Sequence, residues 1–292
     1  MNLSIALITM NEEANLPRTL ESVMPLVSDG RGEIIVLDSG STDRTLEIAR
    51  SFGAKIFVEP WKGFAAQKNS AMEKATGDWV LQLDADEAVE PGLAREICAA
   101  IHHPGAAKAA DQSSPPSVER TVSTEETGGI VPPNLVGFWI PRKNFFLGRW
   151  IRHGGFYPDP KLRLIRRGAG KFAEYGAHPT IQVKGETRWF KGALVHNAYP
   201  SLRGYIDHMN SYSSSGAEVV VARGYRGFNP LNIVIRPLLT LLYNYFVRLG
   251  FLDGREGLLL HLYHAVYVSW KYAKAWELAK ERAKGAGGES SN

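Results

Sequence analysis

The feature that most constrains the fold is a regular alternation of strand-like and helix-like segments in the first hundred residues. Short runs rich in Val, Ile and Leu are each followed by a helical stretch, four times in succession. Parallel strands that are buried on both faces read as nearly continuous apolar runs, so this alternation predicts a parallel sheet covered by helices. The expected strands are 3–10, 32–40, 54–60 and 78–85, and the expected helices are 11–27, 41–53, 64–77 and 91–101.

Local signals set the expected ends of these helices. Acidic residues suit the positive N-terminal end of a helix dipole, so we expect Glu12 and Glu13 to occupy the first turn of the first helix. Gly53 is expected to close the second helix, and Pro91 to lie near the start of the fourth.

The remaining chain divides by composition into three further segments. Residues 103–134 contain five prolines, many Ser and Thr, and almost no large apolar side chains, which predicts a flexible insertion. The segment 135–200 is β-rich, aromatic and basic, and 201–292 is helical and amphipathic. We therefore expect an α/β half over 1–102, a β-rich half over 135–200 and a C-terminal helical region over 201–292.

The C-terminal region contains apolar stretches that are too short to cross a bilayer. Only eleven residues separate Arg236 from Arg248, whereas a spanning helix needs about 20. Helices rich in Tyr, Trp and Leu with basic edges fit a position in the membrane interface. Packing against the main domain or against a second subunit is the alternative.

Charge and cysteine content narrow the class of protein. The single cysteine, Cys98, excludes an internal disulfide, and the first residues show no secretory signal, so a cytoplasmic enzyme is expected. The net charge is +4, but nine Lys or Arg residues and one acid, Asp159, lie between Arg142 and Lys171. Such a cluster suits phosphates, an acidic glycan or lipid headgroups. We expect no nucleic-acid partner.

Acidic residues follow the predicted strands where ligands bind in open α/β sheets. Asp38 ends the second strand, and Asp84 and Asp86 end the fourth. No glycine-rich phosphate loop occurs at these junctions, so a phosphate group would be held through a divalent cation. Alternatively, Asp86 caps the next helix and Asp38 forms a local turn.

Five segments carry a family resemblance: TMNEEANLPRTLESV, EIIVLDSGSTDRTLEIARSFGAKIF, GFAAQKNSAMEKATGDWVLQLDADEAV, YPDPKLRLIRR and GFLDGREGL. They resemble family 2 glycosyltransferases, and within that family the bacterial lipopolysaccharide-core branch of the heptose glucosyltransferase type. The resemblance covers most of the chain except 103–134, and it implies that 1–102 is the nucleotide-sugar-binding half and 135–200 the acceptor-side half of one domain. It implies an α/β GT-A nucleotide-diphospho-sugar transferase fold with a mostly parallel sheet, a nucleotide-sugar donor, a divalent cation (Mn²⁺ or Mg²⁺) and inversion at the anomeric carbon.

Site residues follow from this resemblance position by position. The residues placed at the nucleotide are Thr9, Asn11, Glu12, Asp38, Ser39, Lys68, Asn69 and Asp84. Asp84 would face the ribose or the metal's water shell, and Asp86 would bind the metal itself. His178 and His196 could complete the metal shell or contact the diphosphate, or they could be hydrogen-bonded core residues near β-strands. Glu87 is read as a first-turn acid of the following helix.

The general base is the open question. An inverting transfer needs a carboxylate to accept the acceptor's proton. Relatives often supply it from a Val-His-Glu motif, but here His178 is followed by Pro179. The candidates are Asp159 and Glu174, and Asp159 is favoured because it is the only acid in the basic stretch; its alternative is a salt bridge with Arg163 or Lys161.

The expected function is thus a metal-dependent hexosyltransferase that acts on a lipid-linked or lipopolysaccharide-core acceptor, with a UDP-sugar as the first donor to consider. It would lie peripherally on the inner face of the cytoplasmic membrane. Two alternatives remain: a catalytically weak scaffold that binds nucleotide or membrane, and a sugar nucleotidyltransferase. The second would need a basic glycine-rich N-terminal loop, and ITMNEEAN contains neither Gly nor Lys.

Overall fold

The computed structural model describes residues 2–28, 30, 32–102, 134–173 and 180–288. The predicted insertion therefore lies outside the described residues, apart from Asn134. The chain forms two compact units. The first comprises Met1–Arg142, Pro160–Glu174 and Pro179–His196, and the second consists mainly of Lys143–Asp159 and Asn197–Asn292. The β-rich segment 135–200 is thus divided between the two units.

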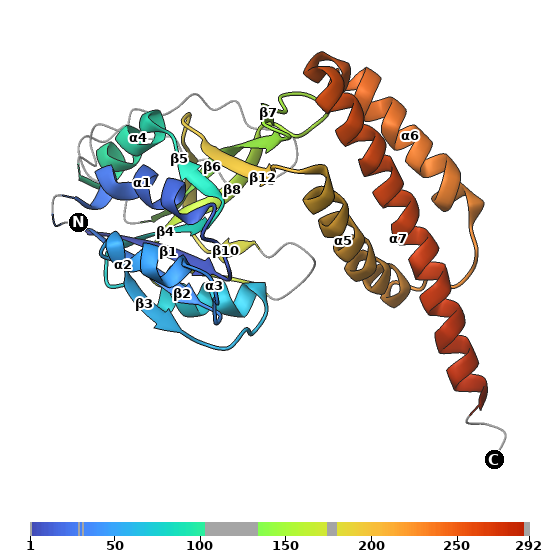
Figure 1. Cartoon of the computed structure of the whole chain (residues 1–292), viewed down its shortest axis with the longest axis horizontal. Coiled ribbons are helices and arrows are strands. Elements are labelled where there is room, and N and C mark those ends of the chain that lie inside the picture. The colour runs from blue at the N-terminus through green and yellow to red at the C-terminus, as the bar shows by residue number, and fades with distance from the viewer. Residues whose placement is uncertain (1, 29, 31, 103–133, 174–179, 289–292) are drawn as a thin grey trace. The chain divides into compact units, whose positions relative to one another are not determined.

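The predicted parallel strands are all present in the first unit (Figure 1). They are β1 (Leu3–Thr9), β2 (Gly32–Asp38), β3 (Lys55–Val58) and β4 (Trp79–Asp84), in the order β3-β2-β1-β4. Each neighbouring pair is parallel, as the continuous apolar runs indicated.

The second half of the sequence extends this sheet. Its strands are β6 (Leu135–Phe146), β7 (Arg149–Trp150), β8 (Asp159–Arg166), β11 (Glu186–Trp189) and β12 (Leu194–Tyr199). β8 runs antiparallel to β4, and beyond it the order continues β6-β12-β5, where β5 is Glu87–Val89. β9 (Gly170–Phe172) and β10 (Ile181–Val183) form a separate antiparallel pair.

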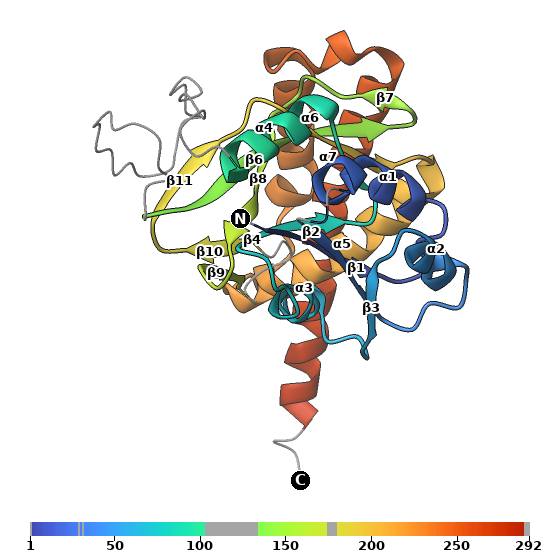
Figure 2. The same ribbon diagram turned by 90° about the vertical axis from the view of Figure 1, so that its left-hand side faces the viewer.

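Helices cover both faces of the parallel strands (Figure 2). α1 (Leu16–Val27), α2 (Thr45–Ser51) and α4 (Pro91–His102) pack with Ile5, Leu7 and Leu81 in one apolar core. α3 (Phe64–Glu73) packs with Ala6 and Val80 in a second core on the opposite face. Alternate residues of β1 and β4 thus pack into different cores, which explains why both faces of these strands are buried.

The start of α1 differs from the prediction. The helix begins at Leu16, and its first turn contains no acidic residue. Asn11 has a φ of 56°, a left-handed conformation that a helix does not allow. The backbone N–H of Glu12 donates to Thr45 Oγ1 at 2.8 Å, and that of Glu13 donates to Asp43 Oδ2 at 3.1 Å. The acidic residues therefore belong to a loop that is tied to the start of α2.

The predicted ends of the next helices are better matched. Gly53, with a φ of 73°, follows α2, and its N–H donates to the carbonyl of Arg50 at 3.0 Å. Pro91 is the first residue of α4. Gly77 does not end a helix, because α3 stops at Glu73. Its role is close packing: a Cβ at Gly77 would lie 2.8 Å from the backbone oxygen of Asn2.

The second unit is largely helical, as predicted. It contains α5 (Leu202–Ala222), a π-helical turn η1 (Leu231–Ile235), α6 (Arg236–Leu242), a second π-helical turn η2 (Tyr243–Val247), a 3₁₀ turn η3 (Gly250–Asp253) and α7 (Gly254–Gly288). α5 and α7 pack along each other through Ala217, Val221, Ala275 and Ala279. Among the described helices, none is both long enough and apolar enough to cross a membrane.

The GFLDGREGL segment builds a buried turn in this unit. Asp253 is 1% exposed and accepts hydrogen bonds from the backbone N–H groups of Arg152 and His153. His261 is equally buried, and Gly154 and Gly250 make room for its ring. A Cβ at Gly154 would lie 1.9 Å from His261 Cε1, so this position requires glycine.

Candidate functional site

Three predicted site residues lie on one edge of the sheet because their strands are parallel and in register. Thr9 pairs with Asp38 across β1 and β2, and Ile8 pairs with Asp84 across β1 and β4. The carboxyl ends of these strands therefore bring Thr9, Asp38 and Asp84 together, at the position where open α/β sheets bind ligands.

Asp38 organises the loop that follows β2. Its Oδ1 accepts from the backbone N–H groups of Gly40 at 2.8 Å and Ser41 at 2.7 Å. Its Oδ2 accepts from Thr9 Oγ1 at 2.7 Å and Ser41 Oγ at 2.5 Å. Burial acts to raise the pKa of Asp38, but these hydrogen bonds outweigh it and hold the pKa below its usual value. Since four donors fill the acceptor positions, the predicted nucleoside contact would require one of them to give way.

The neighbouring residues of the predicted nucleoside pocket belong to the same loop system. Asn11 Oδ1 accepts from the N–H of Thr42 at 2.8 Å, and Ser39 Oγ accepts from Gln67 Nε2 at 3.1 Å. Glu12 Oε2 accepts from Asn15 Nδ2 at 3.0 Å. Burial, together with the charges of nearby acids, raises the pKa of Glu12 despite this hydrogen bond.

Asp84 lies between two buried cations. Lys68 Nζ contacts Asp84 Oδ1 at 2.5 Å, and Arg163 Nη2 donates to Asp84 Oδ2 at 2.7 Å. Burial acts to raise the pKa of Asp84, but Arg163 and Lys68 hold it well below its usual value. Burial also lowers the pKa of Lys68, which Asp84 partly counteracts. Asp84 is thus an ionised carboxylate with both oxygens already engaged by cations.

The structure corrects the prediction for Glu87, which was expected in the first turn of the next helix. It does not start a helix, because α4 begins four residues later; it is the first residue of β5 and is fully buried. Its Oε1 accepts from Arg163 Nη2 at 2.7 Å and from Arg142 Nη1 at 2.9 Å, and its Oε2 accepts from the N–H of Asp84 at 3.1 Å. Glu87 therefore holds two arginines in place beside Asp84.

Arg163 is the central residue that the sequence analysis did not assign to the site. It is 4% exposed and contacts Asp84, Glu87 and Gln82 through its two terminal nitrogens. The available signal was its position between two leucines, Leu162 and Leu164, because a charge that is buried among apolar residues requires partners. Among the described residues its ion-pair partners are Asp84 and Glu87, rather than the suggested Asp159.

Asp86 pairs with a residue of the far strand. His196 Nε2, on β12, lies 3.2 Å from Asp86 Oδ2, and β12 pairs with β5 through His196 and Glu87. Burial acts to raise the pKa of Asp86, but the hydrogen bond and charge of His196 hold it below its usual value. The structure therefore brings together two of the predicted metal residues, Asp86 and His196.

Asn69 uses its side chain elsewhere. Its Nδ2 donates to the carbonyl of Phe172 at 3.0 Å, and its Oδ1 accepts from the N–H of the same residue at 2.7 Å. Both ends of the amide thus hold β9 against α3, and its predicted contact with the nucleotide stays a prediction.

Of the two candidates for the general base, the structure describes only Asp159. Asp159 begins β8, is partly buried and accepts from Asn144 Nδ2 at 3.2 Å. Glu174 and His178 lie outside the described residues, so their predicted roles stay predictions. No group of three or more His, Cys, Asp or Glu side chains that could hold a metal occurs in the part of the chain that the structure describes.

Comparisons with known proteins show which proteins this chain resembles. Residues 4–171 match the family model described as glycosyl transferase family 2. The lipopolysaccharide core biosynthesis glycosyltransferase LpsC of Rhizobium meliloti (strain 1021) is 28% identical over 287 residues, which cover 94% of this chain and 92% of LpsC. An uncharacterised glycosyltransferase of Rickettsia typhi is 43% identical over 95 residues, which cover 32% of this chain and 31% of that protein.

The chain thus spans about a third of the length of the Rickettsia relative. Among solved structures, glucosyl-3-phosphoglycerate synthase from Mycobacterium tuberculosis, in complex with Mg²⁺ and UDP, is 34% identical over 30% of this chain and 34% of that chain. Its TM-score of 0.27 is too low to support an inference.

The family match includes β1 to β4 and the residues around Asp38, Asp84 and Arg163. It confirms the predicted GT-A fold, whose mostly parallel sheet and flanking helices the structure contains. Because the match extends over more than half of the 292 residues, the chain belongs to glycosyl transferase family 2.

Proposed function

We propose that this protein transfers a sugar from a nucleotide-diphosphate sugar to a lipid-linked or lipopolysaccharide-core acceptor, with inversion at the anomeric carbon. Family membership supports glycosyl transfer, and the similarity to LpsC along 94% of the chain supports an acceptor of the lipopolysaccharide-core class. UDP-sugars are the first donors to test.

The observation that carries this proposal is the charged cluster at the carboxyl edge of the parallel strands. Lys68 and Arg163 are buried cations held by Asp84, and Asp86 lies two residues further along with His196 as its partner. Fixed cations beside ionised carboxylates suit a donor that carries a diphosphate, because the cations offset the phosphate charge and the carboxylates accept from sugar hydroxyls or bind a metal.

The residues present fit a divalent cation bound through Asp86. Both oxygens of Asp84 are held by cations, whereas Asp86 Oδ1 makes no hydrogen bond or ion pair with the described residues. Mg²⁺ and Mn²⁺ sites of this kind take one or two carboxylates from the protein and complete their shell with phosphates and water. Such a site does not require a cluster of three protein ligands, and the described residues contain none. When bound, the cation would neutralise charge on the departing diphosphate.

We assign separate tasks to the other side chains. Lys68 and Arg163 keep Asp84 ionised and oriented toward the ribose or the metal's water shell. His196 orients Asp86, in the manner of residues that position metal ligands. Asp159, at the start of β8 and four residues before Arg163, is our proposed base for the acceptor hydroxyl, with Glu174 as the alternative.

The acceptor class determines where the protein would act. A lipid-linked acceptor is confined to a membrane surface, so we propose peripheral attachment to the inner face of the cytoplasmic membrane.

The direct test is incubation with a panel of UDP-sugars, Mn²⁺ and lipopolysaccharide-core acceptor, with release of UDP as the readout. We expect one donor to give metal-dependent release and a product of inverted anomeric configuration by NMR. Asp159→Asn should lower kcat far more than it raises the KM for the donor. Release of pyrophosphate instead would indicate a nucleotidyltransferase, and tight nucleotide binding without turnover would indicate a scaffold.

A further inference from the structure

In the second unit, one helical stretch presents its apolar side outward. From Leu231 to Val247 the chain winds through η1, α6 and η2. Exposed large apolar side chains recur along it at spacings of three and four residues. They are Leu231, Val234, Ile235, Leu238, Leu239, Leu242, Tyr243, Phe246 and Val247, each between 41% and 68% exposed. This spacing marks a single face of a helix, which in a soluble protein normally faces the core.

The other side of the same stretch faces α7. Ser269 Oγ donates to the carbonyl of Ile233 at 2.8 Å, and Pro237 is buried. The guanidinium of Arg236 lies over the ring of Tyr272, 5.2 Å from its centroid, and hydrogen-bonds its hydroxyl. Packing within the unit thus uses the more polar side of the helix and leaves the apolar side exposed.

The exposed surface continues past the helix. Phe228, Leu249, Phe251 and Leu252 are between 43% and 60% exposed. We call the exposed apolar side chains of 228–252 the apolar face. It contains thirteen of the twenty exposed large apolar side chains of the described residues. Such a concentration of exposed apolar side chains on a folded protein normally marks a binding site.

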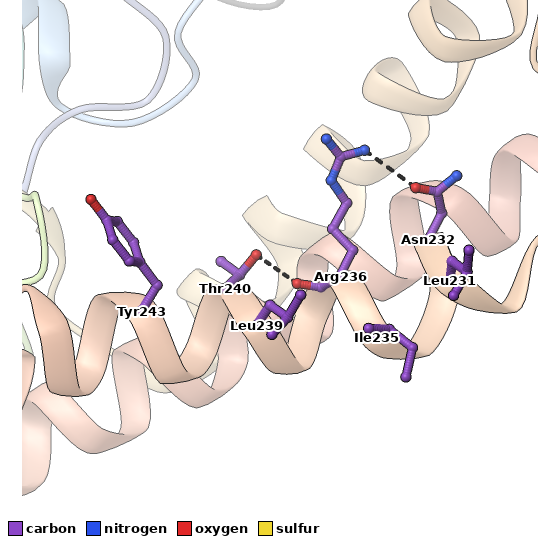
Figure 3. A pocket seen from close by; sticks show the side chains of 7 residues that line it. All are labelled: Leu231, Asn232, Ile235, Arg236, Leu239, Thr240 and Tyr243. Atoms are coloured by element: carbon purple, nitrogen blue, oxygen red, sulfur yellow. Dashed lines mark hydrogen bonds between the residues drawn. The ribbon is translucent and has the colours of Figure 1, made fainter.

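A shallow groove of about 530 Å³ lies along one edge of the apolar face (Figure 3). Leu231, Ile235 and Leu239 line it together with Asn232, Arg236 and Thr240. The amide oxygen of Asn232 accepts from Arg236 at 3.3 Å. The groove therefore has an apolar wall beside a fixed guanidinium, an arrangement that suits a molecule with an apolar tail and an anionic head.

The charged residues of the segment that carries the apolar face have one sign. Between residues 219 and 252 the chain contains four arginines (Arg223, Arg226, Arg236 and Arg248) and no Asp, Glu or Lys, and all four arginines are exposed. A second copy docked through the same face would bring like charges together. A surface rich in lipid phosphate is complementary to them.

We propose that the apolar face docks in the plane of a bilayer that contains anionic phospholipids. The apolar side chains lie among the acyl chains, and the arginines lie at the headgroup phosphates. Aromatic residues such as Tyr243 and Phe246 suit this depth. This proposal deepens the proposed function, which rests on a lipid-linked acceptor, by naming the surface that meets the membrane.

Flotation of the full chain with vesicles tests the proposal without requiring turnover. Two vesicle compositions are used: phosphatidylcholine alone, and phosphatidylcholine mixed with phosphatidylglycerol. We expect binding to the mixed vesicles, and at least about a tenfold loss in Leu239→Glu/Val247→Glu. The matched control is Val58→Glu/Trp61→Glu, two similarly exposed apolar residues of the first unit, which should bind like wild type.

Arginine variants test the electrostatic contribution to vesicle binding. Arg226→Gln/Arg248→Gln should weaken binding to the mixed vesicles by about fivefold per arginine, since each contributes on that order near an anionic surface. Arg44→Gln/Arg203→Gln, whose side chains are 70% and 94% exposed elsewhere, should have no effect. Unchanged melting temperatures would show that all four variants fold.

The outcomes separate this proposal from the proposed function. Vesicle binding that survives Leu239→Glu/Val247→Glu would overturn the docking surface, as would a vesicle-independent dimer that this variant dissociates. If the protein turns over a water-soluble core oligosaccharide but does not bind vesicles, only the docking proposal fails. If it binds vesicles through this face but uses no nucleotide-sugar, only the proposed function fails.

Discussion

Replacing Arg163 with methionine is the sharpest test of the charged cluster. Methionine keeps most of the length and apolar stem of the side chain but removes the charge. Asp84 would keep Lys68 and lose its second cation, and Glu87 would keep Arg142 and lose Arg163. Removing one partner of a buried ion pair costs about 3–5 kcal/mol. Because both carboxylates retain one cation, we expect the lower end, about 3 kcal/mol.

For a unit of this size, a loss of about 3 kcal/mol lowers the melting temperature by roughly 6–12 °C. Thermal unfolding followed by near-ultraviolet circular dichroism measures this shift. The control is Arg44→Met, which removes an exposed pair with Glu47 and should leave the melting temperature unchanged. Since Arg163 lowers the pKa of Asp84, the variant should also raise that pKa.

A double-variant cycle shows whether the cost comes from the stranded carboxylate. Asp84→Asn removes the charge that Arg163 neutralises, so Arg163→Met should cost at least about 1 kcal/mol less in the Asp84→Asn background. A melting temperature within measurement error of wild type for Arg163→Met, or strictly additive effects in the cycle, would refute the claim that these groups form a coupled buried cluster.

Two further predictions concern the second unit. Burial, with the charges of His261 and Lys271, lowers the pKa of His264 to about 4, below the ~6.5 of an exposed imidazole. The unfolded chain therefore binds the proton first, and the free energy of unfolding should fall by roughly 3 kcal/mol as the pH drops from about 6.5 to about 4. Urea titrations should show that His264→Asn loses most of this dependence, and parallel pH profiles would contradict the assignment. Gly154→Ala should destabilise the protein by roughly 2–3 kcal/mol, because the new methyl group displaces the ring of His261. Gly168→Ala, at a similar positive φ with no atom nearby, should cost only about 1 kcal/mol in the same urea assay, and equal losses would show that crowding is not the cause.

The strands of the first half could be predicted because strands that are buried on both faces have a recognisable sequence pattern. Parallel strands with helices on both faces require continuous apolar runs, and β1, β2 and β4 show them. The register then placed Asp38 and Asp84 on one edge, as the acids at the strand ends indicated. The prediction for the start of α1 was wrong because the left-handed conformation of Asn11 cannot be recognised from the periodicity of apolar residues. The loop that contains Asn11 is stabilised by a hydrogen bond to α2, which is distant in the sequence.

The charged cluster could be predicted only in part because its partners are distant in sequence. Glu87 looked like a helix residue, but a three-residue strand buries it beside Arg163, 76 positions later. Asn69 was expected at the nucleotide; its amide holds the backbone of Phe172, a contact that the sequence did not indicate, and its role at the nucleotide stays a prediction. In both cases the residue type was informative, but only the fold decides whether a side chain bonds to its own chain or is available to a ligand.

Calorimetric titration of UDP into the protein, with and without Mn²⁺, tests the central claim most directly. We predict that wild type binds UDP more tightly with Mn²⁺, and that Asp86→Asn loses at least about tenfold of that affinity while its metal-free binding is unchanged. Glu47→Gln, an exposed acid on α2, serves as the control and should match wild type. Binding of UDP with Mn²⁺ that is equally tight in Asp86→Asn and wild type would contradict a donor site built around Asp86.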